Sequence, residues 1–195
     1  MFPKPDYLDS MGGDMVKLGA VAVMFVALAA GAASVQSAAA SPAQLAARSI
    51  TAVDQLEPLV LAELNRVRVA HSLVPLRLSK QLSTAADLHS RSMGRAGFFA
   101  HESKDGSPFW KRVERFYSPG KFARWTVGEN LLWTSGTIDA KRALTLWMAS
   151  PKHRKNLLTP TWREIGIGAV SVLGADGVYE GNDVTIISTD FGARA

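Results

Sequence analysis

The stretches REIGIGAVSV (residues 163–172) and VTIISTDFG (residues 184–192) decide the fold of this chain of 195 residues. Both are rich in β-branched residues, and GADG (residues 174–177) between them contains an Asp-Gly pair, which is typical of a turn. They predict strands joined through a turn near the C-terminus. Apolar residues at helical spacing come earlier in the chain. This order, helices first and strands last, predicts an α+β fold with helices packed on an antiparallel sheet.

Three helices are expected before these strands. The first covers about residues 54–72, where apolar residues recur every three or four positions. The second begins after Ser79, a residue type that caps helices, and ends at Gly97. The third begins near Thr137 or Asp139. Residues 98–136, between the second and third helices, are expected to be irregular, and long loops within compact domains are often functional.

The beginning of the chain differs in character from the rest. Residues 18–33 carry no charge, and a small-residue A-x-A sequence ends at Ala40. This pattern predicts a secretory signal peptide over residues 1–40, with cleavage after Ala40. The alternative is an uncleaved anchor, because residues 18–35 are just long enough to span a bilayer and would then associate with the membrane.

The rest of the chain is expected to form a linker over residues 41–53 and one folded domain over residues 54–195. A cleaved signal peptide and an uncleaved anchor would both place this domain outside the cytoplasm. The protein is therefore expected to be secreted, periplasmic or attached to the cell envelope.

Composition narrows the expected partners. The chain has no cysteine, which excludes a disulfide framework and a cysteine-ligated zinc site. Its net charge is +5, but lysine and arginine are scattered instead of clustered on one element, so no nucleic-acid partner is expected. A basic surface favours anionic partners such as lipid headgroups or envelope polymers.

Four histidines are the main candidates for chemistry. His71 ends the first helix, where a cation interacts favourably with the helix dipole. His89 lies on the apolar face of the second helix and is expected to be a hydrogen-bonded core residue. His101, in FFAHESKDG, and His153, in SPKHRKN, lie beside helix ends, where loops can present a side chain to a ligand.

A single carboxylate, Glu129, lies among apolar and aromatic residues in RWTVGENLLW (residues 124–133). Burial of a carboxylate is costly unless another group compensates its charge. Two imidazoles and one carboxylate are a known zinc set, and the same three groups also perform acid–base chemistry without metal. The wide spacing between His101, Glu129 and His153 does not show that they meet, so the residues alone indicate only a His/Glu site in the long loops.

Seven motifs follow one another along residues 56–192 in a familiar order. They are LNRVR (64–68), VPLRLSKQLSTAADLHSRSM (74–93), FFAHESKDGSPFWKRV (98–113), VGENL (127–131), LWMASPKHRKNLL (146–158), REIGIG (163–168) and STDFG (188–192). Together they resemble the CAP superfamily, also called SCP-like extracellular proteins, in its bacterial branch without cysteines. The resemblance implies a three-layer α-β-α sandwich.

The resemblance also implies a site. In the family, the residues that match His101, Glu129 and His153 meet in a central cleft, and members hold a divalent metal there, commonly zinc. Animal members have a second glutamate in this cleft. The matching position here is Ser150, which leaves three strong ligands.

Three residues are expected to support the cleft: Ser150, Asn130 and Arg112. Asn130 would bond the backbone beside Glu129, and Arg112 and Asn156 would brace the loops that carry the two histidines. Asp190, near the final strand, would pair with a basic residue.

Three functions remain open from the sequence. The first is a secreted or envelope binding module whose cleft takes a divalent metal or a small amphipathic, lipid-like ligand. The second is a zinc-assisted hydrolase of peptides or envelope polymers, with Glu129 as a third ligand or as the catalytic base, two roles that exclude each other on one metal ion. The third is a hydrogen-bonded network of His101, Glu129 and His153 that only holds the loops.

Overall fold

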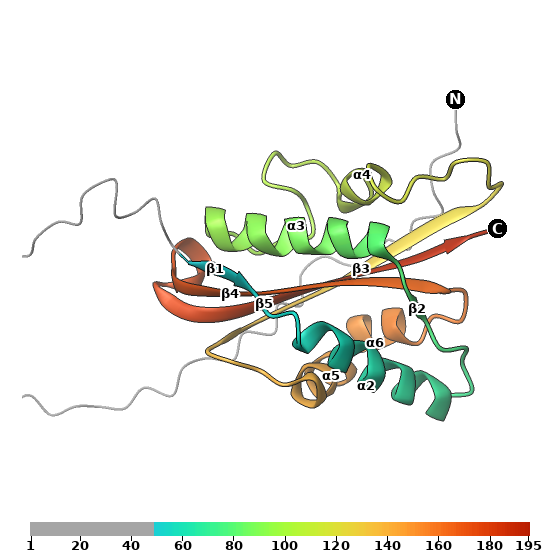
Figure 1. Cartoon of the computed structure of the whole chain (residues 1–195), viewed down its shortest axis with the longest axis horizontal. Helices are drawn as coiled ribbons and strands as arrows, with labels where there is room; N and C mark the ends of the chain where they lie inside the picture. The colour runs from blue at the N-terminus through green and yellow to red at the C-terminus, as the bar shows by residue number, and fades with distance from the viewer. Residues whose placement is uncertain (1–48) are drawn as a thin grey trace, which may run out of the picture.

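The computed structural model describes residues 49–195, so the expected signal segment and most of the linker lie outside the described residues. Figure 1 shows a sheet between two layers of helices, with α3 and α4 on one face and α2, α5 and α6 on the other. This arrangement confirms the predicted α+β fold and its three-layer α-β-α sandwich.

The elements follow the chain in this order: β1 (Ile50–Ala52), α2 (Leu56–Ala70), β2 (Arg77–Leu78), α3 (Lys80–Ala96), α4 (Phe109–Glu114), β3 (Trp125–Ser135), α5 (Ala140–Ala149), α6 (Pro151–Leu157), β4 (Glu164–Ala175), a 3₁₀ turn (Gly177–Tyr179) and β5 (Asn182–Arg194). The strand order is β1-β4-β5-β3 with antiparallel neighbours, and the short β2 pairs parallel to β4. None of the helices within residues 49–195 is long and apolar enough to cross a membrane.

The predicted helices form where their local signals lie. The Ser79 side chain accepts a hydrogen bond from the backbone N–H of Leu82, and α3 ends at Gly97 in the left-handed conformation with φ 66°. Asp139 caps α5 by accepting from the N–H of Arg142 at 2.7 Å. Pro151 begins the separate helix α6 instead of continuing α5, because proline fits a first helical turn and lacks the N–H that a continuing helix needs.

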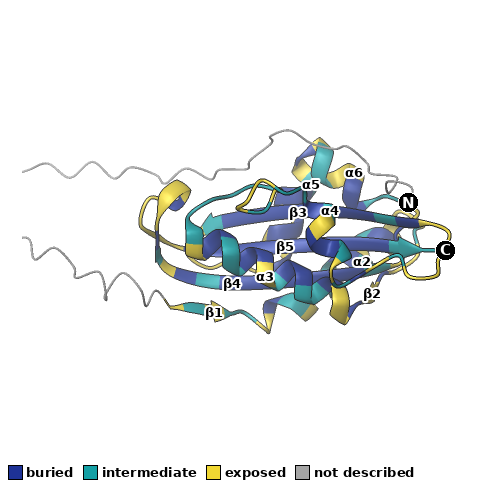
Figure 2. Ribbon diagram, turned by 90° about the horizontal axis from the view of Figure 1, so that it is seen from above, coloured by how far each residue is buried: buried dark blue, intermediate teal, exposed yellow. Residues whose placement is uncertain are grey.

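The expectation that residues 98–136 are irregular is wrong for two parts of this range. The range contains the short helix α4 and the whole of β3, an eleven-residue strand that pairs with β5 along its full length. Because β3 is buried on both faces from Val127 to Trp133, its sequence lacks the alternation of polar and apolar residues that marks a half-buried strand. Figure 2 shows the central strands buried over most of their length, with exposed residues gathered in loops and on outer helix faces.

One contact holds a helical layer directly on the sheet, and another holds two helices of the opposite layer together. On one face, the backbone of α3 lies directly on β4 at Gly166 and Gly168, where a Cβ atom would come within 2.0 and 2.2 Å of α3 backbone atoms. On the other face, the buried Arg68 of α2 donates to the carbonyl oxygens of Leu157 at 2.7 Å and Thr159 at 3.1 Å. Arg68 thereby fixes the C-terminal end of α6 against α2.

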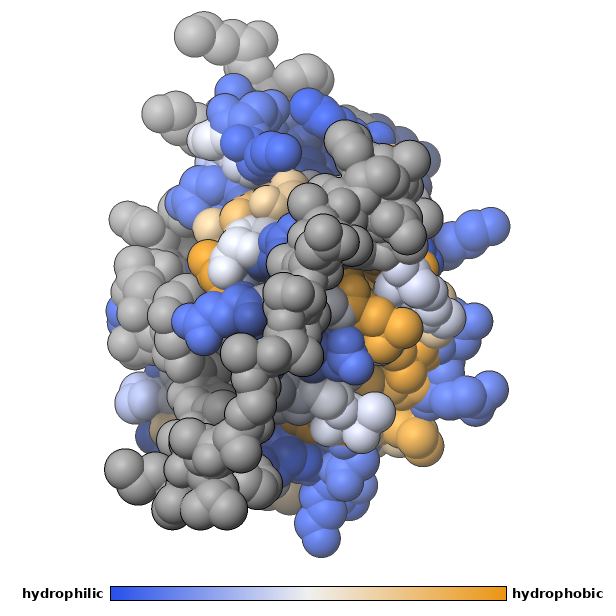
Figure 3. All heavy atoms as spheres, turned by 90° about the vertical axis from the view of Figure 1, so that its left-hand side faces the viewer, coloured by the Kyte–Doolittle hydropathy of each residue, from blue (hydrophilic) through white to orange (hydrophobic). Residues whose placement is uncertain are grey.

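Figure 3 shows the end of the domain at which β1 begins, where hydrophilic and apolar side chains of the described residues both reach the surface. The large core lies elsewhere, between the sheet and the layer of α2, α5 and α6, and contains the fully buried Trp147 and Trp162. The sheet and its two helical layers therefore provide a rigid frame for the residues around the middle of β3.

Candidate functional site

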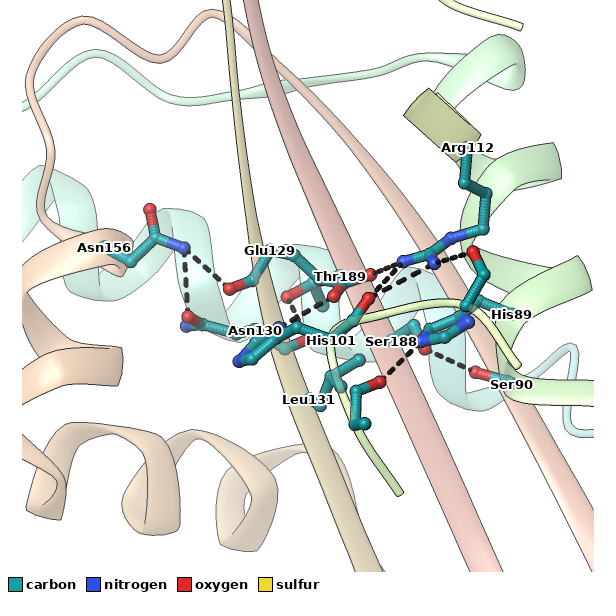
Figure 4. Close-up of polar contacts among 12 residues, drawn as sticks. His89, Ser90, His101, Arg112, Glu129, Asn130, Leu131, Asn156, Ser188 and Thr189 are labelled. Carbon is teal, nitrogen blue, oxygen red and sulfur yellow. Dashed lines mark hydrogen bonds and ion pairs between the residues drawn. The ribbon is translucent and has the colours of Figure 1, made fainter. Parts of the chain in front are cut away.

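Glu129 lies in the middle of β3, and its side chain is fully buried. It faces the α3 layer, as do Leu131 and Trp133, which pack with Met93 of α3. Figure 4 shows His101 and Arg112 pointing at its carboxylate from the loop after α3 and from α4. The three residues therefore come from one strand, one loop and one short helix.

Both oxygens of the Glu129 carboxylate have a partner. His101 Nδ1 lies 2.8 Å from Oε1, and Arg112 Nη2 donates to Oε2 in an ion pair. An ionised carboxylate only accepts hydrogen bonds, so the Nδ1 atom of His101 must carry the proton between them. Since the guanidinium is charged at every accessible pH, Arg112 compensates the buried charge of Glu129 permanently.

Arg112 also holds the loop that carries His101. It is buried on the inner side of α4, and its Nη1 atom donates to Ser103 Oγ at 3.0 Å and to the carbonyl oxygen of His101 at 3.3 Å. One guanidinium thus fixes the glutamate and the backbone of the histidine together. A signal for this role is present in FWKRV, where Phe109, Arg112 and Val113 fall on one helical face, although nothing local identifies Glu129 as the partner.

The charges around Glu129 determine how the site titrates. Burial alone would raise the pKa of Glu129, but Arg112 and the nearby imidazoles outweigh it and hold this pKa below its usual value. Burial alone would lower the pKa of His101, but its hydrogen bond to Glu129 and the charge of that carboxylate raise it overall. Glu129 is therefore ionised at neutral pH, and His101 takes up a proton more readily than a free histidine.

The His101 side chain is 29 % exposed, whereas the carboxylate behind it is fully buried. Its Nδ1 atom is directed inward to Glu129, and among residues 49–195 no hydrogen-bond partner is described for Nε2. The ring thus offers its outer edge to solvent while its inner edge is held. A fixed imidazole with one available nitrogen can bind a ligand by a hydrogen bond or exchange a proton with it.

His153 approaches β3 from the opposite helical layer. It lies on α6, and its carbonyl oxygen accepts a hydrogen bond from Asn130 Nδ2 at 3.2 Å. Asn156, also on α6, donates to the carbonyl oxygen of Glu129 at 3.1 Å and to Asn130 Oδ1 at 3.0 Å. Side-chain amides therefore bind α6 to the edge strand β3, with His101 on one side of that strand and His153 on the other.

Ser150 lies at the break between α5 and α6 and is buried. Its side chain makes no capping hydrogen bond to α6, and Oγ has no hydrogen-bond partner within the described part of the chain. The position that the resemblance matches to a second glutamate thus carries a small, buried hydroxyl group in this chain.

The expectation that Asp190 pairs with a basic residue is wrong. Asp190 lies directly opposite Glu129 on β5, is fully buried, and has no hydrogen-bond partner for either carboxyl oxygen within the described chain. Burial raises its pKa well above the usual value, and the neighbouring Glu129 carboxylate raises it further. Asp190 thus keeps its proton to a higher pH than an ordinary aspartate, whereas the Glu129 carboxylate beside it loses its proton at a lower pH than an ordinary glutamate. The two residues meet through the register of β3 and β5, which the sequence alone does not give.

The core role expected of His89 agrees with its position. His89 is 1 % exposed, and its Nε2 atom lies 2.9 Å from the carbonyl oxygen of Ala100. Burial lowers the pKa of His89 to about 4, so it is neutral under ordinary conditions. It fixes the start of the loop that leads to His101.

The raised pKa of Asp190 leads to a pH-dependent prediction for Asp190→Asn. A carboxyl group whose pKa is raised by folding keeps its proton in the folded state, whereas the unfolded chain loses it above about pH 4. Stability contributed at low pH is therefore lost as the pH rises. Asparagine removes this loss, so we expect the substitution to raise the melting temperature by a few degrees at about pH 8 and to change it little at about pH 4. Circular dichroism measures both. Equal destabilisation at the two pH values would show that Asp190 is a charged, paired carboxylate.

The donor set does not fit the three-ligand metal site that the resemblance implies. Among residues 49–195, no three side chains of histidine, cysteine, aspartate or glutamate form a group that could hold a metal ion. Both Glu129 oxygens are engaged by His101 and Arg112. A divalent metal at His101, Glu129 and His153 is therefore implied by the family resemblance alone.

Comparison with known proteins agrees with the fold. An extracellular protein containing an SCP domain from Bacillus anthracis superposes with a TM-score of 0.55 at 25 % identity, over 72 % of this chain and 41 % of that chain. An outer surface protein from Borrelia burgdorferi superposes with a TM-score of 0.57 over 76 % of this chain and all of that chain. Its identity is 17 %, so this likeness concerns the fold alone.

Two curated proteins of Bacillus subtilis (strain 168) are similar in sequence. The uncharacterized protein YkwD is 33 % identical over 121 residues, which cover 62 % of this chain and 44 % of YkwD. The uncharacterized membrane protein YlbC is 30 % identical over 112 residues, which cover 57 % of this chain and 31 % of YlbC. The chain thus spans less than half the length of these relatives.

The chain also matches the model of one protein family. The model described as CAP, the cysteine-rich secretory protein family, matches residues 61–179. This range contains most of α2, all of α3 to α6, β3, β4 and every site residue discussed above except Asp190. Because the match covers more than half of the chain, the protein belongs to the CAP family, in a form without cysteine.

Proposed function

We propose that the protein is an extracellular or cell-envelope CAP-domain module that binds a small amphipathic ligand at His101. The observation that carries this proposal is the half-buried imidazole, which is fixed from behind by a fully buried Glu129 and is open on its outer edge. Fixing a polar group in advance reduces the entropy lost when a ligand binds it. A buried, charge-compensated carboxylate behind an accessible imidazole is a costly arrangement for a loop that has only a structural role.

The surroundings of His101 support an amphipathic ligand. Phe98 and Phe99 closely precede it and are partly buried against the core between α3 and the sheet, and the partly buried Trp110 lies in α4. We expect these aromatic residues, which lie close to His101 along the chain or on the neighbouring helix, to accept the apolar part of a ligand whose polar group meets the imidazole.

The location outside the cytoplasm is supported by the relatives. The family is described as secretory, the Bacillus anthracis protein as extracellular, and the Borrelia burgdorferi protein as an outer surface protein. The apolar run at residues 18–33 supports the same location, as a cleaved signal or as an anchor.

The zinc-assisted hydrolase has less support. That function needs a metal ion with an open position for water, commonly held by three protein ligands. His101, Glu129 and His153 would be those ligands, and the metal would supply an activated water. The donor set within residues 49–195 does not fit the ion, so the geometry gives no support for a hydrolytic step.

The test of the proposed function uses two amphipathic probes, oleic acid and lysophosphatidylglycerol. We expect native mass spectrometry of the purified protein to detect a 1:1 complex with at least one of them. His101→Gln is expected to weaken this complex at least tenfold, because the imidazole is the contact. His71→Gln is the matched control, since His71 is exposed at the end of α2. Absence of binding, or equal binding by His101→Gln, would contradict the proposal.

A further inference from the structure

The Glu129 carboxylate is fully buried, and a buried negative charge needs a positive charge nearby. A bound metal ion and a basic side chain are two ways to supply it. In this chain Arg112 contacts Oε2 directly and also donates to two groups of the His101 loop. The positive charge is thus part of the polypeptide and is anchored at several points.

The spacing of His101 and Glu129 also disfavours an ion between them. Their facing atoms, Nδ1 and Oε1, lie 2.8 Å apart, which is a direct hydrogen bond. Two ligands at the usual zinc distances of about 2.0–2.2 Å, in tetrahedral geometry, lie about 3.4 Å from each other. A zinc ion shared by these atoms would have to break the hydrogen bond and move the ring.

The other oxygen is blocked by charge. A divalent ion at Oε2 would have to displace the Arg112 guanidinium, which cannot lose its proton to escape the repulsion. Arg112 is buried among acceptors that it satisfies, Ser103 Oγ and the His101 carbonyl oxygen, so displacement would leave these groups without their donor.

We infer that Arg112 takes the place of a metal ion at Glu129 and keeps divalent cations out of the site, so that His101 binds its ligand without metal. This inference rests on the proposed function, because it concerns the same imidazole, and it names Arg112 as a positioning residue. It has one direct consequence for the ligand. Binding of oleic acid or lysophosphatidylglycerol should be unchanged by the chelator EDTA.

The test measures zinc affinity by isothermal titration calorimetry for the wild type and for Glu129→Gln, Arg112→Gln and the double variant. We expect Glu129→Gln to bind zinc with wild-type affinity within about twofold, because its carboxylate is not a ligand. Arg112→Gln is expected to bind at least tenfold more tightly, since the Glu129 carboxylate loses its positive partner and becomes available together with His101. The double variant should lose this gain. Arg66→Gln is the matched control, because Arg66 pairs with Glu63 on the exposed surface of α2.

Two results would overturn the inference. One is a tenfold or greater loss of zinc affinity in Glu129→Gln, and the other is no gain in Arg112→Gln. Where these variants fail to fold, the wild type decides: an unchanged melting temperature in excess zinc supports the inference, and a rise of several degrees overturns it. Failure of the proposed function would be seen in a different experiment. The amphipathic probes would then not bind, or would bind equally well to His101→Gln, and either result is independent of the zinc affinity.

Discussion

Gly168→Ala is expected to prevent folding, or to reduce the free energy of unfolding by most of its value. Gly168 lies in β4 under α3, where an added Cβ would be 2.2 Å from the backbone nitrogen of Asp87 and 2.4 Å from its Cα. The obstacles are backbone atoms, so no side-chain rotation relieves the clash. Overpacking of a core commonly costs about 1–3 kcal/mol and occasionally more, and here α3 would have to leave the sheet. A domain of this size has only about 5–15 kcal/mol of stability to lose.

The measurement is urea unfolding followed by tryptophan fluorescence and circular dichroism. Gly136→Ala is the control for adding a methyl group at a glycine. Gly136 has φ 67° and no atom within 4 Å of an added Cβ, so alanine there costs only about 1–2 kcal/mol of backbone strain. A Gly168→Ala protein as stable as Gly136→Ala would show that α3 does not lie directly on β4.

Separate removal of Arg112 and Glu129 is expected to cost about 3–5 kcal/mol each, because each change leaves the other charge buried without its partner. The side chain of Glu129 is fully buried, and the side chain of Arg112 is 9 % exposed. The double variant, Arg112→Met with Glu129→Gln, leaves no unpaired charge. We therefore expect its loss of stability to be at least about 2 kcal/mol smaller than the sum of the two single losses.

Urea unfolding of the four proteins gives this coupling energy. Arg91 and Asp87 provide the control cycle, because they form an ion pair on α3 with side chains 30 and 33 % exposed. Ion pairs of that kind contribute less than about 1 kcal/mol. A coupling between Arg112 and Glu129 no larger than that of the control pair would contradict the claim that Arg112 compensates the buried carboxylate.

The parts of the fold that followed from the sequence have local causes. Ser79 and Gly97 determine the ends of α3 through a side-chain cap and a left-handed residue, which depend only on nearby atoms. The apolar stripes of α2, α3 and α5 and the β-branched residues of β4 and β5 are equally local. Strand β3 was not predicted because both its faces are buried, so its polar and apolar residues do not alternate, and VGEN near its centre is not rich in β-branched residues.

The site was predictable in its residues but not in its contacts. Glu129 and His101 follow from chemistry and from the family resemblance, yet their partners come from other elements. Arg112 is seventeen residues from Glu129 along the chain, and Asp190 reaches it only through the register of β3 and β5. An ion pair across elements leaves no periodic signal in a sequence. The sequence therefore indicated that a charge needed compensation without identifying the side chain that compensates it.

A crystal structure of the wild-type protein, determined after soaking in zinc, shows directly whether Arg112 excludes a metal ion from Glu129. We expect Arg112 to remain on Glu129 Oε2 and His101 Nδ1 to remain within hydrogen-bond distance of Oε1, with no ion between them. A zinc ion at about 2.0–2.2 Å from both His101 and Glu129, with the guanidinium of Arg112 displaced, would contradict the account.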